Sequence, residues 1–593
     1  MTKVREWLPG RSASRCAVPL SFAVLMGIGM AHAGPLAPRL GQTDPLLLPV
    51  AIEEATPRAG AFVEDNVRFS ALVSRIQDVL KQLGLYNGPV DGAFSPTTER
   101  AIRIYESQVA LPITGQPTKE LLDHLETVGR ANKLLVRLGE SRERGQREAR
   151  ELLAASELTK KLEVTEPENA NPLRDPGPCF AAPTASCLLA EAFESAKTVA
   201  DVKFRDWVLG DIAVAQAGAG ETDLVFRTIS LIGDPRLTVA ALRDSGIAWA
   251  RAGKTAEARD VAVGMPDAMA ASEVIAAIAL AEATSGTPQS LGRTLGELLA
   301  RASQSGRTAG AASLFATLAA QLKVAGASEA AEDLVNVALD IAQDATLSAS
   351  DRDRVFGEVA AVLATMGNVE KAKALLQEIG DKTQRRQALL ALAERSVAAG
   401  DTDGALKAAG DVSDMRYRVI ALTDVAIAQV RLGNSDAARE TIERARADAE
   451  EIDQRFTYAK AFAASRIAAA LAELRGFEAA AETASKIDDD GLRAQSLWHL
   501  ASVQARDGTE GSHHTRNRAL EAADGIASAL DRSWTLARLA LTSAREGEPG
   551  LARETFDAAI AVASKIENGF ARASALAKLA ATLVEMDRAR AAR

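Results

Sequence analysis

The sequence is poor in the residues that build strands, disulfide frameworks and aromatic cores. Its 593 residues include only 3 cysteines, 5 histidines and 4% aromatic residues. Runs of valine, isoleucine, threonine and tyrosine are nearly absent, whereas alanine, leucine, glutamate and arginine dominate. This composition predicts an all-α protein. The chain is too long for one ordinary core, so it predicts several domains or an extended repeat array.

Residues suited to catalysis are also scarce. The adjacent pair His513-His514 lacks the i, i+4 spacing that places two metal ligands on one helix face, so we expect it in a solvated loop. The sequence contains no nucleophile elbow, no phosphate-binding glycine loop and no Cys-x-x-Cys pair. We therefore expect no catalytic residue, no metal site and no cofactor.

The N-terminal residues are typical of an export signal. An apolar stretch over residues 16–30 is shorter than the roughly 20 residues that a spanning helix needs. Ala31-His32-Ala33 then supplies small residues around a cleavage position. We expect residues 1–33 to be a signal peptide, with an uncleaved anchor as the alternative, and no membrane segment later in the chain. The basic start consists of Lys3, Arg5, Arg11 and Arg15.

Removal of residues 1–33 changes the charge and the cysteine content. It takes away four basic residues and one acidic residue, so the formal charge moves from −10 to −13. Such an acidic chain is a poor partner for nucleic acid. Cys179 and Cys187 remain, separated by a proline-containing turn, and in an oxidising compartment they predict a disulfide. Two free thiols are the alternative, and no histidine lies near enough in sequence to complete a zinc site.

Composition divides the remaining chain into four parts. Residues 34–65 are rich in proline and predict a flexible linker. Residues 66–128 have a compact helical pattern with a Gly- and Pro-containing turn in the middle. Residues 129–186 predict a charged helix followed by a second proline-rich linker. Residues 187–593 repeat.

The repeats are marked by a glycine between two helical stretches, at spacings of 32 to 43 residues. Glycine suits this place because it closes a helix in the left-handed conformation without steric cost. Seven positions before each glycine the residue is always small, and eleven positions before it the residue is apolar in nine of ten units. The pattern predicts ten helix pairs stacked as a solenoid. The glycines are Gly220, Gly253, Gly286, Gly326, Gly367, Gly400, Gly433, Gly476, Gly508 and Gly547.

These helix pairs resemble the tetratricopeptide family. The small residue of the first helix, the turn glycine and an alanine five residues later match that family's pattern. Most units lack the early aromatic residue, and no proline regularly closes the second helix. The resemblance implies an α-α superhelix that binds protein partners through a concave groove.

Residues 66–128 resemble small three-helix peptidoglycan-binding domains. Ser95 stands where that family usually has glycine, and Tyr105-Glu106 replaces an aromatic residue followed by glutamine. The resemblance implies a wall-binding motif at Tyr86, Asp91, Phe94, Thr97 and Tyr105, although the fold is also reused as a protein-interaction or spacer module. The matching residues are Ile76-Gln77, Leu80, residues 83–98, Ala101-Ile102, Tyr105 and residues 111–115.

In tetratricopeptide-like arrays the first helix of each pair lines the concave face. Positions two, ten and thirteen before the turn glycine would project there, and they hold several of the residue types favoured at binding hot spots. They predict a groove for an acidic segment of an envelope protein. The alternative is that the arginines form a solvated face and the tryptophans lie in the core. The groove residues are Arg243, Arg251, Arg431, Trp498, Arg506, Trp534 and Arg545.

Together these features predict a non-enzymatic scaffold, periplasmic or secreted, that docks on peptidoglycan and binds an envelope protein. An accessory or regulatory subunit of a wall-remodelling or secretion complex is one alternative. A peptidoglycan-cleaving enzyme is the alternative from another class, because Glu194-Ser195 matches the acid-serine dipeptide of wall-cleaving transglycosylases. The repeat array begins directly after this dipeptide and leaves no room for a lysozyme-type domain.

Overall fold

A computed structural model describes residues 66–154, 162, 169–171, 173–265, 267–344, 346–398 and 400–593. The predicted signal peptide (residues 1–33) and proline-rich linker (residues 34–65) lie outside the described residues. Across the described ranges the chain forms 26 helices and no strand, which confirms the all-α fold. It divides into two units, one ending at Gly139 and the other beginning at Glu140.

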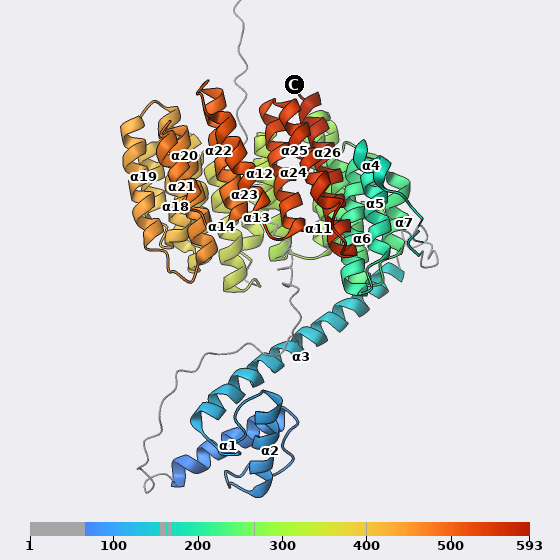
Figure 1. Cartoon of the computed structure of the whole chain (residues 1–593), viewed down its shortest axis with the longest axis vertical. Helices are drawn as coiled ribbons and strands as arrows, with labels where there is room; N and C mark the ends of the chain where they lie inside the picture. The colour runs from blue at the N-terminus through green and yellow to red at the C-terminus, as the bar shows by residue number, and fades with distance from the viewer. Residues whose placement is uncertain are drawn as a thin grey trace, which may run out of the picture. The chain divides into compact units, whose positions relative to one another are not determined.

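The first unit contains α1 (Asn66–Gln82), α2 (Pro96–Gln108) and the start of α3 (Lys119–Ala154) (Figure 1). The side chain of Ser95 caps α2 by accepting a hydrogen bond from the Thr98 N–H, and Pro96 is the first residue of the helix. The predicted cap is therefore present. The core of this unit consists of Ile76, Leu80, Tyr86, Ala101, Ile102, Tyr105, Leu121, Leu122 and Leu125.

The helix α3 runs without interruption across the predicted boundary at residue 128. Its first turns complete the three-helix domain, and its later turns are the predicted charged helix. Every residue from 130 to 141 is exposed, and Leu134, Leu135 and Leu138 are 56–61% accessible. Solvent therefore reaches this segment on every face of the helix.

Limited trypsin digestion is expected to cut α3 before it cuts any other helix. Arg130, Lys133 and Arg137 lie in the exposed segment, where a local opening breaks only helical hydrogen bonds. Mass spectrometry of the early fragments would locate the cuts. Equally early cuts within α12 (Ala309–Val324) or α18 (Met415–Arg431) would contradict this prediction.

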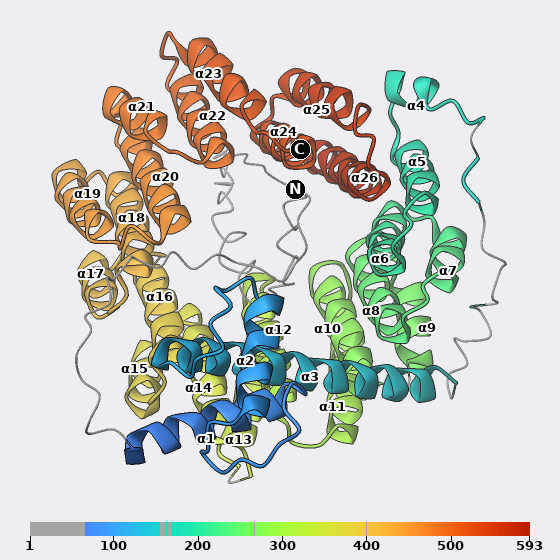
Figure 2. The ribbon, with the colours of Figure 1, turned by 60° about the horizontal axis from the view of Figure 1, so that its bottom comes forward.

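From α6 onward the helices alternate between an inner and an outer circle (Figure 2). Each inner helix packs against the next inner helix and against the outer helix that follows it. The inner helices are α6 (Val202–Ala219), α8 (Pro235–Arg251), α10 (Ala268–Ser285), α12, α14 (Ala349–Thr365), α16 (Lys382–Ala398), α18, α20 (Thr457–Glu473), α22 (Asp490–Arg506), α24 (Ala529–Glu546) and α26 (Gly569–Ala591). The outer helices are α7 (Thr222–Ser230), α9 (Thr255–Gly264), α11 (Pro288–Gln304), α13 (Ser328–Ala342), α15 (Val369–Glu378), α17 (Thr402–Gly410), α19 (Ser435–Glu450), α21 (Phe477–Ser485), α23 (Ser512–Asp524) and α25 (Pro549–Ala563).

The turn glycines follow the predicted pattern in eight of ten units, with φ between 66° and 89°. Two predictions were wrong. Gly286 has φ −95°, and Gly476 has φ −80° because the preceding Arg475 takes the left-handed place, with φ 61°. The α20 unit is therefore shifted by one residue relative to the glycine alignment.

The small residues seven positions before the glycines allow close helix packing. Ala213 and Ala279 are fully buried. A Cβ atom on Gly246 would lie 2.9 Å from a methyl carbon of Val274 on the next inner helix. No larger side chain fits there without moving a neighbour, so the repeated small residue sets the distance between helices.

The array closes on itself. The last helix, α26, packs against α6 as the other inner helices pack against one another, and α5 (Ala185–Lys197) fills the outer place between them (Figure 2). Residues 185–593 thus form a ring of eleven helix pairs. The turn glycines predicted only ten pairs. The eleventh pair has no turn glycine, because α5 and α26 lie at opposite ends of the array.

Among the residues that the structure describes, one helix is long and apolar enough, by length and composition, to cross a membrane, although no such segment was predicted after residue 33. It is α10, whose mean hydropathy is 1.3 over 18 residues. In the ring, α10 packs against α8 and α12, and Val274, Ile275 and Ile278 are at most 2% exposed. Burial of these aliphatic side chains between two neighbouring inner helices accounts for part of its apolar composition.

Candidate functional site

The loop that precedes α2 is held in shape by one buried side chain, Gln77 of α1. Its Nε2 donates hydrogen bonds to the Ala93 carbonyl at 2.9 Å and to Thr98 Oγ1 at 3.0 Å. Its Oε1 accepts from the N–H groups of Asp91 and Gly92 at 3.1 and 3.0 Å. Because Gln77 is 0% exposed, these bonds are shielded from water and define the loop conformation.

Two residues of the predicted wall-binding motif support the same loop. Tyr86 is 2% exposed, and its hydroxyl donates to the Pro89 carbonyl at 2.9 Å. Asp91 accepts a hydrogen bond from the Ala93 N–H at 2.9 Å, and this bond is the largest cause that lowers the Asp91 pKa. Tyr86 therefore supports the loop from inside, whereas Asp91 also faces solvent.

The Tyr105-Glu106 pair, which departs from the family pattern, is also structural. Tyr105 is 2% exposed and forms a 2.6 Å hydrogen bond with His124 Nδ1, and burial raises its pKa to about 12. Glu106 is 4% exposed and accepts hydrogen bonds from Thr114 Oγ1 and the Gly115 N–H at 2.6 and 2.8 Å. Both side chains therefore form their hydrogen bonds with other residues of the domain.

The surface that the loop offers to a ligand is formed by other side chains. Phe94 and Thr97 of the predicted motif are exposed, and so is Val90, which was not among the predicted motif residues. Phe94 and Val90 are each 38% accessible, although both are apolar. The sequence could have indicated this exposed surface, because apolar residues stand in a Gly- and Pro-containing loop. Exposed apolar side chains on a loop held by buried hydrogen bonds suit binding of a partly apolar ligand.

The predicted groove residues lie on the inner helices of the ring (Figure 2). Arg251, Arg431, Arg506 and Arg545 are exposed near the C-terminal ends of these helices, whereas Arg243 and Trp534 are partly buried. The prediction that Trp498 lines the groove was wrong. Its side chain is 1% exposed and cannot contact a partner in this conformation. Its ring lies in a core cluster with Ala484, Leu497, Ala519 and Leu539.

Carboxylates on the same or a neighbouring helix pair with three of the predicted groove arginines. Arg506 pairs with Glu473 at 3.1 Å, and Arg545 lies 3.8 Å from Glu585. Hydrogen bonding from His499 is the largest cause that lowers the pKa of Glu473 to about 2. Arg243 likewise contacts two carboxylates, at 2.8 and 3.2 Å. The inner face therefore carries mixed charge, which favours a partner with both signs over a purely acidic one.

Burial raises the pKa of the carboxyl groups of Glu358, Glu394 and Asp424 on the inner helices. Burial, together with the nearby charge of Asp424, raises the pKa of Glu394 in α16 to about 7. Asp424 itself pairs with Arg466 of α20. Nothing in the sequence marks Glu394, because its environment is formed by the neighbouring repeat units.

Replacing Glu394 with glutamine is expected to raise the melting temperature of the ring by a few degrees at pH 8 and to change it little at pH 5. The folded pKa of about 7 lies above the ordinary value of 4.5, so the unfolding free energy falls as pH rises through this interval. Glutamine has no charge, so the variant does not lose this unfolding free energy. Thermal unfolding followed by circular dichroism would measure the melting temperatures, with the exposed Glu370→Gln as control. Equal shifts at both pH values would contradict the prediction.

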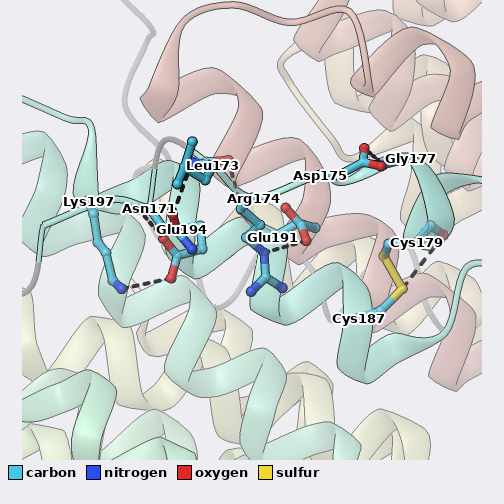
Figure 3. Close-up of polar contacts among 11 residues, drawn as sticks. Asn171, Leu173, Arg174, Asp175, Gly177, Cys179, Cys187, Glu191, Glu194 and Lys197 are labelled. Carbon is cyan, nitrogen blue, oxygen red and sulfur yellow. Dashed lines mark hydrogen bonds and ion pairs between the residues drawn. A yellow bond between two sulfur atoms is a disulfide. The ribbon is translucent and has the colours of Figure 1, made fainter.

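Glu194, the residue on which the enzymatic alternative depends, is engaged in structural contacts (Figure 3). Its carboxylate pairs with Lys197 at 2.7 Å and accepts a hydrogen bond from the Asn171 N–H at 3.1 Å. Burial alone would raise the pKa of Glu194, but these hydrogen bonds lower it overall. A general acid needs a raised pKa, so this arrangement does not favour that role.

The structure contains the predicted disulfide between Cys179 in α4 (Gly177–Ala181) and Cys187 in α5 (Figure 3). In the part of the chain that the structure describes, no group of three or more histidine, cysteine or acidic side chains is arranged to hold a metal ion.

One part of this chain is similar in sequence to known proteins. A family model described as "Putative peptidoglycan binding domain" matches residues 70–125. A stretch of 62 residues is 42% identical to "Putative OxPP cycle protein OpcA" of Synechococcus elongatus, which covers 10% of this chain and 14% of that protein. The first unit is therefore a peptidoglycan-binding-like domain, and the chain spans only a small fraction of the curated relative it matches.

Two solved structures cover more of the chain at low similarity. Ton1535 from Thermococcus onnurineus NA1 is 17% identical, with a TM-score of 0.25, over 55% of this chain and 96% of that one. A circular tandem repeat protein with a novel repeat topology and enhanced subunit contact surfaces is 14% identical, with a TM-score of 0.17, over 88% and 98%. At these scores neither likeness bears on function.

Proposed function

We propose that this protein is a non-enzymatic scaffold of the bacterial cell envelope, periplasmic or secreted. Its N-terminal domain docks on peptidoglycan, and the ring holds a protein partner on its inner helices. The observation that carries the proposal is the match of residues 70–125 to a peptidoglycan-binding family, on a domain whose loop is held by Gln77 and exposes Phe94. Export remains a prediction from residues 1–33.

Sedimentation of the full-length protein with purified sacculi tests wall docking. Phe94→Ala is expected to weaken co-sedimentation about tenfold or more, because it removes an exposed apolar side chain from the loop without touching the core. Leu134→Ala, which truncates a 58% exposed leucine on α3, is the matched control. Failure of the wild-type protein to pellet would remove peptidoglycan from the proposal.

Crosslinking in the envelope fraction, followed by affinity purification, tests the scaffold role of the ring. Reversing the charge of Arg251, which is exposed near the end of α8, is expected to reduce recovery of a specific partner. Charge reversal at Arg439, exposed on the outer helix α19, is the control. Unchanged recovery in both variants would place the partner elsewhere than the inner helices.

A zymogram on purified wall distinguishes the scaffold from a wall-cleaving enzyme. We expect no lytic band from the purified full-length protein. A band that Glu194→Gln abolished would overturn the non-enzymatic proposal.

A further inference from the structure

The ring has one joint that differs from all the others. Between successive pairs of the array the chain passes directly from one pair to the next, whereas α26 begins at residue 569 and its inner neighbour α6 begins at residue 202. Non-covalent contacts, most of them among α26, α5 and α6, hold this joint closed. Closing so long a segment costs conformational entropy, which these contacts must offset.

Aromatic side chains are concentrated at this joint, although they make up only 4% of the chain. Phe570 at the start of α26 lies 5.3 Å from Phe204 and 6.2 Å from Trp207, measured between ring centroids. At the other end of α26, Arg588 donates a hydrogen bond to the Gly218 carbonyl at 3.1 Å. The contact between α26 and α6 therefore runs along most of both helices.

The short helix α4 bridges the two sides of the joint. Cys179 of α4 is bonded to Cys187 of α5, and the next residue, Phe180, lies under the guanidinium of Arg572 in α26, 5.6 Å from the ring centroid. The segment before α4 lies along α5, where Arg174 pairs with Glu191 at 2.7 Å (Figure 3). The disulfide thus ties to α5 a helix whose aromatic side chain also contacts α26.

We propose that the Cys179–Cys187 disulfide is a redox-sensitive latch on this joint. Both cysteines are partly exposed, so a soluble dithiol can reach them. Reduction would break the S–S bond and leave two thiols, each sulfur taking one electron and one proton, while the external dithiol becomes a disulfide. The freed α4 would then withdraw Phe180 from α26, and the joint would open more often. This consequence rests on the partner binding proposed above: an open joint would admit an elongated partner to the inner helices from the side.

Hydrogen exchange of the full-length protein, measured by mass spectrometry with and without dithiothreitol, tests the latch. Reduction is expected to speed amide exchange at least tenfold in the N-terminal half of α26 and in α5. Amide exchange in peptides from α12 and α13, which lie several helix pairs away from the joint, is expected to stay unchanged. The double variant Cys179→Ser, Cys187→Ser should exchange like the reduced protein and ignore dithiothreitol.

Two results would overturn the proposal. Faster exchange confined to residues 177–190, with exchange in α26 unchanged, would show that the disulfide only fixes α4 to α5. Faster exchange everywhere, including α12 and α13, would indicate general destabilisation of the ring. If the double variant fails to fold, reduction of the folded wild-type protein in place gives the same readout.

Discussion

Gln77→Leu is expected to lower the unfolding free energy of the N-terminal domain by about 3 kcal/mol, since each buried polar group left without a partner costs roughly 1–3 kcal/mol. Leucine fills a similar volume but offers no hydrogen bond. The N–H groups of Asp91 and Gly92 would lose the acceptor that holds the loop. Thermal unfolding and hydrogen exchange of residues 86–98 would measure the loss.

Gln82→Leu is the matched control, because Gln82 lies on the same helix, is exposed and contacts only Asp78 among the described hydrogen bonds. A change below about 0.5 kcal/mol is expected there. Similar losses in the two variants would show that burial of Gln77 does not determine the loop. If the loop is the docking surface, Gln77→Leu should also abolish sedimentation with sacculi while Gln82→Leu leaves it intact.

Gly569→Ala is expected to destabilise the ring, although alanine normally stabilises a helix relative to glycine by roughly 0.5–1 kcal/mol. A Cβ atom on Gly569 would lie 2.1 Å from Thr198 Oγ1 and 3.0 Å from the Ser195 carbonyl oxygen. The carbonyl belongs to the backbone of α5 and cannot rotate away. The start of α26 would therefore be pushed off α5, at a cost of about 1–3 kcal/mol.

Gly550→Ala tests whether this effect belongs to the joint. Gly550 also lies in the first turn of a helix, α25, and a Cβ atom there would meet nothing within 4 Å. The two substitutions are chemically identical, but the expected changes in melting temperature have opposite signs. A neutral or positive change for Gly569→Ala would mean that the joint carries little of the ring's stability.

The features that could be read from the sequence are those set by neighbouring residues. Ser95 and Pro96 start α2 wherever the helix is placed, because a side-chain cap and a fixed φ act within one turn. Eight turn glycines adopt the left-handed conformation for the same local reason. The all-α fold, the pairing of helices and the disulfide cysteines followed from such patterns.

Where the sequence interpretation went wrong, distant residues decided the outcome. Trp498 had the spacing of a groove residue, but its indole is buried because Ala484 and Ala519 leave room for it. Arg475 took the place expected for Gly476 because α20 ends one residue earlier than the glycine alignment implies. Gln77 matched a family pattern, yet its role depends on a loop 14 to 21 residues further along the chain.

The sequence by itself determined that this protein is helical, that its helices come in pairs and that a peptidoglycan-binding-like domain precedes them. Only the tertiary structure decided that the array closes into a ring, that α5 supplies the eleventh outer helix and that the cysteines lie at the joint. The physical reason is separation along the chain. Helix ends and turns depend on interactions within a few residues, whereas closure depends on contacts between Phe570 and residues more than 360 positions earlier.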